Sequence, residues 1–233
     1  NMAEPSIMMY DNDLLHDGPR LEALCERLER EGIRKNFLCY GSVHAVLANR
    51  AAVERFARNG LRAVLIGYES FDPGQLAHYR KGSTPDDNLA AAEFLRSIRV
   101  DAWASFILHP DWDAADFRSF RRHLRALRPQ VASMSPLTPF LPIPFFKPYE
   151  DRLLFARDDY EKWSFSQVTI QPSRMSLRRY YYEVLKSNLY INLWSNNLGY
   201  LVRKFGLGTV LRLMRGSLRV MRRYWKLMRD APG

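Results

Sequence analysis

Short apolar runs alternate with helical patterns through the first 135 residues of the chain. Each run is followed by apolar residues spaced three or four positions apart, which is the spacing of a helix that buries one side. The predicted strands cover residues 6–10, 36–40, 63–67, 102–108 and 130–134. Strands that alternate with helices predict a parallel sheet with right-handed crossovers, and strands this apolar are expected to be buried on both faces.

The predicted helices carry end signals in their sequences. The first ends at Gly32, and the second ends at Gly60. The third begins at Thr84, whose side chain suits a helix N-cap, and Asp86 and Asp87 in its first turn suit the helix dipole. A fourth helix is expected over residues 114–127. We read the segment Lys81–Thr84 as a connector, because it lacks the rest of a phosphate-binding loop.

The composition changes after Pro136. Five prolines fall within residues 136–148 and predict an extended loop. Residues 149–175 are charged and irregular in pattern, and the chain is predicted to be helical from Ser176 to its end. We therefore expect an α/β fold of two parts. Residues 1–148 would form a partial TIM-like (β/α) barrel of about five parallel strands, and residues 149–233 would form a helical C-terminal extension.

Polar residues cluster at the carboxyl ends of the predicted strands. In (β/α) barrels the chemistry takes place at these ends, so the pattern predicts one functional rim. The segments at the rim are Asp11-Asn12-Asp13, Tyr40-Gly41-Ser42, Tyr68-Glu69-Ser70, His109-Pro110-Asp111 and Leu137-Thr138-Pro139.

Composition narrows the class of protein further. The chain has 233 residues, of which 47% are hydrophobic, and this is enough to fill a core. Its two cysteines, Cys25 and Cys39, are too few and too far apart for a metal knuckle or a disulfide framework, so we expect buried thiols in a reducing cytosol and no metal site. No membrane span or signal peptide is expected. The chain begins with Asn1, and we expect it to be truncated at its N-terminus.

The net charge of +10 is concentrated near the C-terminus. Residues 200–229 contain nine basic residues and no acid, with apolar residues interleaved at steps of three or four. This pattern predicts a basic amphipathic helix that suits an anionic membrane surface, and plain packing against the barrel is an equally weighted alternative. Nucleic acid is disfavoured as a partner because no stacking platform is present. The residues expected to contact the membrane are Arg212, Arg215, Arg219, Arg222 and Trp225.

Four segments in order resemble the second half of a radical S-adenosylmethionine (SAM) enzyme. They read GLRAVLIGYES from Gly60, RKGSTPDDNLAAAEFLRS, DAWASFILHPDWDAADF and VASMSPLTPF. The resemblance covers roughly residues 5–145, and the CxxxCxxC cluster loop of the family is not in this sequence. The segment Asp159–Glu183 also resembles a tail of the cobalamin-binding branch. The resemblance implies SAM, a [4Fe–4S] cluster whose ligands are absent from this chain, and cobalamin on a domain that is also absent.

The resemblance also implies roles for residues at the rim. Glu69 matches a position that reaches the ribose or amino group of SAM, with a surface ion pair to Arg62 or Arg80 as its alternative. For His109 a structural role is the favoured interpretation, with proton donation or substrate contact as its alternative. The usual GGE is missing at Asp11–Asp13, which also suit a turn and helix cap, and the glycines of the family's fourth strand are replaced within Ala104–Asp111. The expected SAM-binding residues are Asp11, Asn12, Asp13, Tyr40, Ser42, Glu69, Ser70, Ser105 and Thr138.

Two hypotheses of function follow. In the first, the chain is part of an enzyme that cleaves SAM to functionalise or methylate an unactivated carbon of a small-molecule or lipid-like substrate. In the second, it is a non-catalytic barrel fragment that binds a membrane surface or a protein through its basic tail. We expect a cytoplasmic protein, which would lie at the inner face of the membrane if its basic tail binds lipid. The sequence does not indicate an oligomeric state.

Overall fold

The computed structural model describes residues 4–140, 144–196 and 198–232. Its contacts divide the chain into two compact units. The first unit runs up to Phe106 and includes His123–Ser133, and the second consists of Ile107–Arg122 and the chain from Met134 onward. The predicted division at residue 148 stays a prediction, and each unit is described below by itself.

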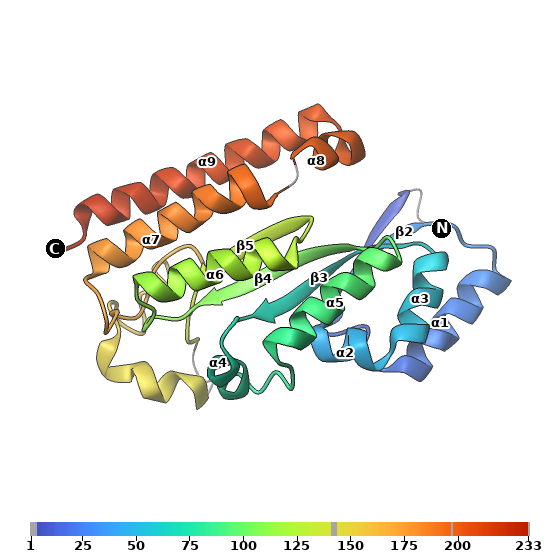
Figure 1. Ribbon diagram of the computed structural model, residues 1–233, viewed down its shortest axis with the longest axis horizontal. Helices are drawn as coiled ribbons and strands as arrows, with labels where there is room; N and C mark the ends of the chain where they lie inside the picture. Colours follow the sequence, from blue (N-terminus) through green and yellow to red (C-terminus); the bar gives the residue numbers. More distant parts are fainter. Residues whose placement is uncertain (1–3, 141–143, 197, 233) are drawn as a thin grey trace. The chain divides into compact units, whose positions relative to one another are not determined.

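A five-stranded sheet forms the framework of the fold. Its strands lie in the order β1-β2-β3-β4-β5, and β1 to β4 pair in parallel, each with the next. Helices connect successive strands (Figure 1), so the predicted α/β class is confirmed. The strands are β1 (Ser6–Met9), β2 (Asn36–Ser42), β3 (Leu61–Glu69), β4 (Asp101–Leu108) and β5 (Val131–Pro136).

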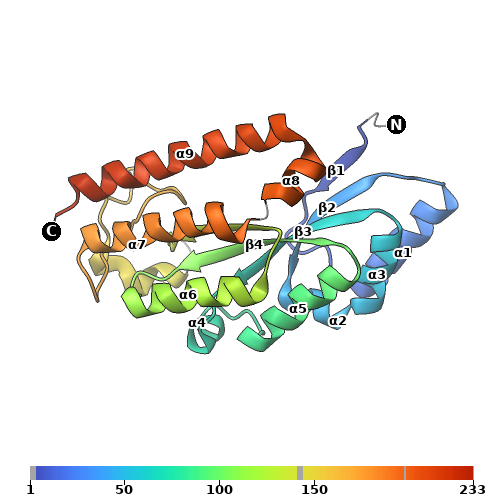
Figure 2. The ribbon, with the colours of Figure 1, turned by 45° about the horizontal axis from the view of Figure 1, so that its top comes forward.

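The helices of the first unit cover one face of its strands. Figures 1 and 2 show α1, α3 and α5 on the same side of the sheet, and the ring of Phe37 in β2 packs against Phe56 in α3 at 5.4 Å. The short helices α2 and α4 were not predicted, because six residues are too few to show a helical period. The helices are α1 (Gly18–Arg30), α2 (Val43–Ala48), α3 (Arg50–Arg58), α4 (Pro73–His78), α5 (Pro85–Ser97) and α6 (Ala114–Leu127), of which α6 continues into the second unit.

Burial alternates along β2, and this corrects the expectation that the strands are buried on both faces. Phe37 and Cys39 are buried beside the helices, whereas Leu38, Tyr40 and Ser42 on the opposite face are only half-buried. Successive residues of a strand point to opposite faces, so these three lie together on one side of the sheet. The face away from α1, α3 and α5 is therefore the one that offers polar groups to a ligand.

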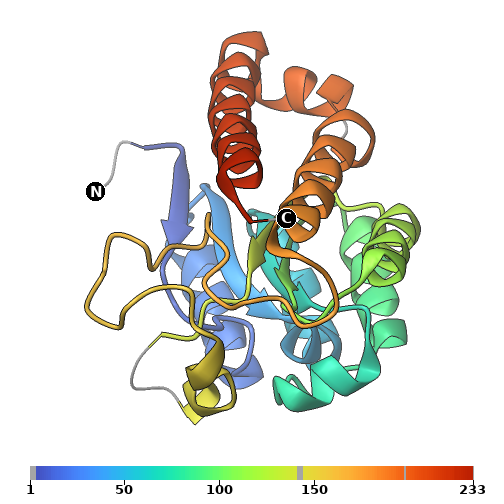
Figure 3. The ribbon, with the colours of Figure 1, turned by 90° about the vertical axis from the view of Figure 1, so that its left-hand side faces the viewer.

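The second unit has an aromatic core of its own. Trp112 packs against Phe117 and Phe120 of α6, and Phe117 in turn packs edge-on against Tyr180 of α7 at 5.3 Å. Within the predicted proline-rich loop, residues 141–143 lie outside the described residues, and the 3-10 helix η1 begins at Pro144 and ends at Arg152. Loops connect η1 to α7 (Figure 3).

Helices form the C-terminal part of the second unit, as predicted. They are α7 (Leu177–Tyr190), the π-helical turn η2 (Ile191–Ser195), α8 (Leu198–Phe205) and α9 (Leu207–Asp230). α7 and α9 lie side by side and antiparallel, with the rings of Tyr181 and Tyr224 6.2 Å apart (Figure 3). The basic segment of residues 200–229, which was expected to contain a basic amphipathic helix, is divided between α8 and α9. Gly206 adopts a left-handed φ of 79°, which ends α8 and starts α9, and glycine takes this conformation without steric cost.

Candidate functional site

Three strands of the first unit bring small and polar residues into one row. Ser42 of β2 lies in register with Gly67 of β3, and Gly67 lies in register with Ser105 of β4. Tyr40 lies two residues before Ser42, so it shares the half-buried face with this row. The predicted residues Tyr40, Ser42 and Ser105 are therefore brought together on the face that α1, α3 and α5 leave uncovered.

Glu69 has the most unusual conformation at this edge. The register between β3 and β4 shifts at Gly67 and Glu69, and Glu69 has a left-handed φ of 61°. Left-handed backbone is uncommon outside glycine and costs about 1–3 kcal/mol, and bulges of this kind often redirect a side chain near a functional site. The strained backbone therefore indicates that Glu69 is a candidate functional residue.

The bulge directs the Glu69 carboxylate back over Gly67. A Cβ atom built on Gly67 would lie 2.5 Å from Oε1 of Glu69, so the missing side chain leaves room for the carboxylate. The side chain of Glu69 is only 12% exposed, and Nζ of Lys81 lies 2.6 Å from the same oxygen. Sequence reasoning identified Glu69 and Gly67 but treated Lys81 as part of a connector. The distance of twelve residues between Glu69 and Lys81 gives no local signal for the pair.

Asn88 holds the bulge from both sides. Its Nδ2 donates hydrogen bonds to the carbonyl oxygens of Tyr68, at 3.3 Å, and Ser70, at 3.0 Å, which are the residues flanking Glu69. The side chain of Asn88 is fully buried, and buried hydrogen bonds of this kind can hold a strained residue in place. Sequence reasoning missed Asn88. A polar residue on the buried side of the predicted helix after Thr84 was the available signal.

Ser70 supports the fold in this structure. Its hydroxyl donates to Oε1 of Gln75 at 2.7 Å and accepts from the backbone N–H of Asp72 at 3.1 Å. These contacts link the end of β3 to the start of α4. The contacts of the Ser70 side chain thus position its backbone, which lies next to Glu69. Binding of SAM by Ser70 stays a prediction.

The loop after β1 is tied to the end of β2. The Asp13 carboxylate accepts from the backbone N–H of Ser42 at 3.2 Å and from its hydroxyl at 2.6 Å, and Ser42 caps α2. Asp11 pairs with Arg20 at 3.2 Å, and Asn12 is exposed. The backbone N–H of Asp13 also donates to the Asp11 carboxylate, so these contacts match the turn alternative for Asp11–Asp13. The N-cap residue of α1 is Asp17, and the role of Asp11–Asp13 in binding SAM stays a prediction.

In the second unit, His109 lies in a hydrogen-bonded network just after β4. Its Nε2 lies 3.2 Å from the Tyr149 hydroxyl, and its Nδ1 accepts from the backbone N–H of Asp111 at 3.2 Å. The hydroxyl of Tyr180 donates to the carbonyl oxygen of His109 at 3.0 Å. Burial, reinforced by the charge of Asp111, raises the pKa of Tyr149 above its usual value. These hydrogen bonds match a structural role for His109, and its role toward a substrate stays a prediction.

Asp111 is the anchor of the same network. Arg152 forms an ion pair with its carboxylate, and the Ser173 hydroxyl donates to Oδ1 at 2.5 Å. Burial alone would raise the pKa of Asp111, but the hydrogen bonds from Arg152 and Ser173 outweigh it and hold the pKa below its usual value. Thr138 lies in the same unit, and its hydroxyl donates to the carbonyl oxygen of Pro136 at 3.1 Å.

Both cysteines are buried in the first unit. Burial raises the pKa of the Cys25 thiol to about 11 and that of Cys39 to about 12. Thiols with such pKa values stay protonated near neutral pH, whereas metal ligation needs the thiolate. The two thiols also lie on different elements, Cys25 on α1 and Cys39 on β2. Among the described residues, no group of three or more His, Cys, Asp or Glu side chains is arranged to hold a metal ion.

The basic residues predicted to contact a membrane lie on the exposed surface of α9. Arg212, Arg215, Arg219 and Arg222 are all exposed, and Trp225 is 51% exposed. Within the part of the chain that the structure describes, no helix has the length and apolar character to cross a bilayer.

Comparisons with known proteins identify relatives of the chain. No family model matches it. The chain is 26% identical over 224 residues to hopanoid C-3 methylase of Methylococcus capsulatus, an alignment that covers 96% of this chain and 42% of the relative. The chain thus spans less than half the length of this curated relative.

Solved structures share the fold. TsrM of Kitasatospora setae, a radical SAM methyltransferase solved with cobalamin and a [4Fe–4S] cluster bound, aligns with a TM-score of 0.52 at 16% identity, over 63% of this chain and 31% of TsrM. The radical SAM coproporphyrinogen III oxidase HemN of Escherichia coli aligns with a TM-score of 0.50 at 12% identity, over 59% of this chain and 32% of HemN. The chain is thus similar in sequence to a hopanoid C-3 methylase, and it shares its fold with radical SAM enzymes.

Proposed function

We propose that this chain forms the SAM-binding part of a radical SAM methylase. The observation that carries the proposal is the Glu69 carboxylate, placed over Gly67 by a strained bulge that Asn88 holds. A buried carboxylate accepts hydrogen bonds from an amino group or from ribose hydroxyls, and both groups are present in SAM. The relationship to a hopanoid C-3 methylase favours this hypothesis over the non-catalytic alternative.

The residues of the uncovered face fit the groups of SAM. Glu69 would hold the ribose or the amino group, and Lys81 would orient the carboxylate while it is free of ligand. Ser42 and Ser105 offer hydroxyl groups on either side of Gly67, where the backbone of a glycine permits a close approach. Together with a reduced [4Fe–4S] cluster, SAM supplies the radical chemistry of the family, and the protein supplies position and shielding.

The cluster ligands would come from outside this chain. A [4Fe–4S] cluster needs at least three thiolates, and the chain contains two thiols, both buried and on different elements. The proposal that cobalamin takes part rests on the similarity to cobalamin-binding radical SAM proteins such as TsrM. No residue of this chain is assigned to cobalamin. The substrate would be a small molecule, and we propose that it is lipid-like because the chain carries a candidate membrane-binding helix, described below.

Reconstitution of an iron–sulfur cluster tests whether the cluster ligands come from outside this chain. We expect this chain, incubated anaerobically with iron and sulfide, to acquire no absorbance in the visible charge-transfer region, because Cys25 and Cys39 stay buried as thiols. A Cys25→Ser, Cys39→Ser double variant serves as the blank. A stable cluster on the parent chain that is lost in the double variant would overturn the assignment.

We also propose that α9 binds an anionic membrane surface. Leu211, Met214, Leu218 and Trp225 are 42–51% exposed and follow one another at steps of three, four and seven residues, so they form one stripe along α9. Arg215 and the other basic residues flank this stripe. Tyr224, by contrast, packs against α7, so α9 keeps its apolar stripe outside the packed face. Each basic group near an anionic surface contributes about 1 kcal/mol. In the cell, the inner face of the membrane is the surface we propose.

Vesicle binding tests this second proposal. We expect the chain to co-sediment with anionic but not with neutral vesicles, and salt should weaken the binding because charges are screened within about 8 Å at physiological ionic strength. Trp225→Ser should weaken binding even at low salt, since it removes apolar contact. Trp194→Ser is the matched control, because Trp194 is 69% exposed but lies on η2. Equal loss in both variants, or no binding by the parent, would contradict the proposal.

A further inference from the structure

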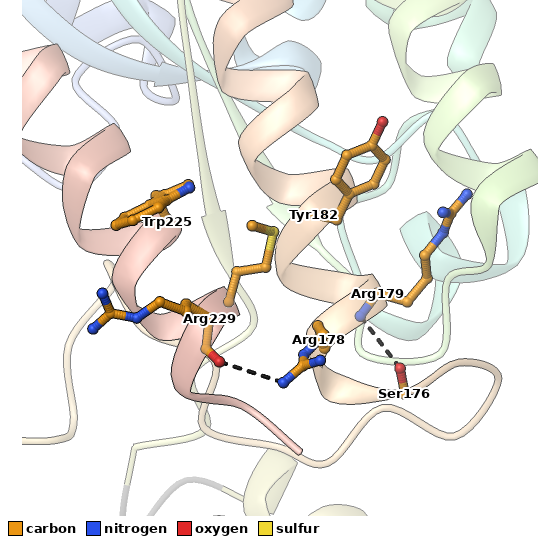
Figure 4. Close-up of a pocket in the computed structure, with 7 residues that line it drawn as sticks. Ser176, Arg178, Arg179, Tyr182, Trp225 and Arg229 are labelled. Carbon is orange, nitrogen blue, oxygen red and sulfur yellow. Dashed lines mark hydrogen bonds between the residues drawn. The ribbon is translucent and has the colours of Figure 1, made fainter. Parts of the chain in front are cut away.

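A groove of about 480 Å³ lies between α7 and the C-terminal end of α9. Ser176, the N-cap residue of α7, lies at one end of the groove, and Trp225 and Tyr182 project from the two helices (Figure 4). This volume is within the range of small-molecule sites, which is about 300–1,000 Å³. It is large enough for a polar headgroup and the first carbons of an attached chain.

Three arginines give the groove its charge. Arg178 and Arg179 come from α7 and Arg229 comes from α9, and no acidic residue is among the described residues that line the groove. Arg178 donates to the carbonyl oxygen of Ala231 at 3.2 Å and to that of Arg229 at 3.4 Å, and Figure 4 shows the second of these hydrogen bonds. These neutral acceptors orient its guanidinium group without compensating its charge. The groove therefore attracts an anion.

Two aromatic rings position the other guanidinium groups. Arg179 lies over the ring of Tyr182 at 5.0 Å, and Arg229 lies over the ring of Trp225 at 5.3 Å. Each also has an acidic neighbour, Glu183 at 3.5 Å from Arg179 and Asp230 at 3.0 Å from Arg229. Stacking uses the face of a guanidinium group and leaves N–H groups at its edge, which suit the oxygens of a phosphate or carboxylate.

The apolar part of the groove continues onto the exposed stripe of α9. Trp225 belongs to both, and Met228 lines the groove one turn further along the helix. A ligand that places an anionic group on the arginines can therefore extend apolar atoms along Trp225 toward Leu218. This combination fits an anionic amphiphile better than a free inorganic anion, which would use only the charged part.

We propose that this groove binds the phosphate-bearing headgroup of an anionic phospholipid in the bilayer. The guanidinium groups would hold the phosphate, and Trp225 and Met228 would contact the first apolar carbons. The inference rests on the proposed membrane binding of α9 and adds a defined lipid site to it. A zwitterionic headgroup is a poorer ligand, because its cationic end would meet three arginines.

A soluble short-chain lipid separates this site from general attraction to a bilayer. Dihexanoyl phosphatidylglycerol, kept below its micelle concentration, is titrated into the chain by calorimetry, with dihexanoyl phosphatidylcholine and inorganic phosphate as comparison ligands. We expect saturable binding of phosphatidylglycerol that is stronger than binding of either comparison ligand. Arg178→Gln should weaken it about tenfold, the usual size of a lost charge-assisted hydrogen bond. Arg122→Gln removes the same charge from an exposed position of α6 outside the groove and should leave binding unchanged.

Each outcome decides the matter. Equal losses in Arg178→Gln and Arg122→Gln, or phosphate bound as tightly as the lipid, would overturn the lipid site. Binding of anionic vesicles without binding of the soluble lipid would overturn the groove and leave membrane association standing. Binding of the soluble lipid without binding of anionic vesicles would overturn membrane association, and with it a site for lipid in the bilayer. Because Arg178 contacts the end of α9, Arg229→Gln provides a second variant with an exposed side chain, and circular dichroism verifies the fold of each variant.

Discussion

Replacing Glu69 by alanine is expected to weaken SAM binding at least about tenfold in the complete protein. The Glu69 carboxylate is nearly buried, faces Lys81 and lies over Gly67, so it is held ready to accept hydrogen bonds from the ligand. Hydrogen bonds that involve a charged group contribute about 1.5–3 kcal/mol, and a loss of 1.4 kcal/mol is already tenfold in affinity. Equilibrium dialysis with labelled SAM measures the dissociation constant directly.

Controls separate the carboxylate from the bulge. Glu93→Ala removes an exposed glutamate from α5 and should leave the affinity unchanged. Glu69→Gln keeps the size of the side chain but not its charge, so it should lose affinity while the fold is kept. If Glu69→Ala binds SAM like the parent, Glu69 is not a SAM ligand. The strained backbone would then need another explanation.

The alternation of strands and helices could be predicted because it depends on local patterns. Apolar runs locate β1 to β5, and the capping box at Thr84 is visible in the sequence because its members lie three residues apart. The half-buried outer face of β2 could not be predicted, since Leu38 is apolar and Tyr40 is partly so. Which faces the helices cover depends on how the whole chain packs, which a local pattern does not record.

The candidate site shows the same limit more sharply. Family resemblance located Glu69, but its left-handed backbone, its partner Lys81 and the support from Asn88 all depend on contacts between elements distant in sequence. The acidic cluster at Asp11–Asp13 was weighed both as a ligand and as a turn and cap, and in the structure Asp13 accepts hydrogen bonds from Ser42, the N-cap residue of α2. The residue types of the candidate site could be identified from the sequence, whereas their contacts depend on tertiary packing.

Replacing Arg121 by methionine is expected to destabilise the second unit by about 3–5 kcal/mol, the usual cost of leaving one member of a buried ion pair alone. Arg121 of α6 donates to Oε2 of Glu183 in α7 through both terminal nitrogens at 3.2 Å, and to the Ser187 hydroxyl at 2.8 Å. The side chain of Glu183 is only 2% exposed. Without Arg121, this carboxylate would stay buried with only the largely exposed guanidinium group of Arg179, at 3.5 Å, as compensation. Urea unfolding followed by circular dichroism measures the loss.

The matched control is Arg122→Met, one residue further along α6. Arg122 is exposed and hydrogen-bonds Ser119 on its own helix, so its removal should change the free energy of unfolding by no more than about 0.5 kcal/mol. Adding Glu183→Leu to Arg121→Met should restore most of the lost stability, because a buried ion pair replaced by apolar side chains is often neutral. If the double variant is as unstable as Arg121→Met alone, then the unpaired charge of Glu183 is not the cause of the lost stability. Arg178 and Tyr182, which line the lipid groove, also lie on α7. Lipid binding by the stabilised double variant would therefore show whether the groove needs the ion pair itself or only a folded α7.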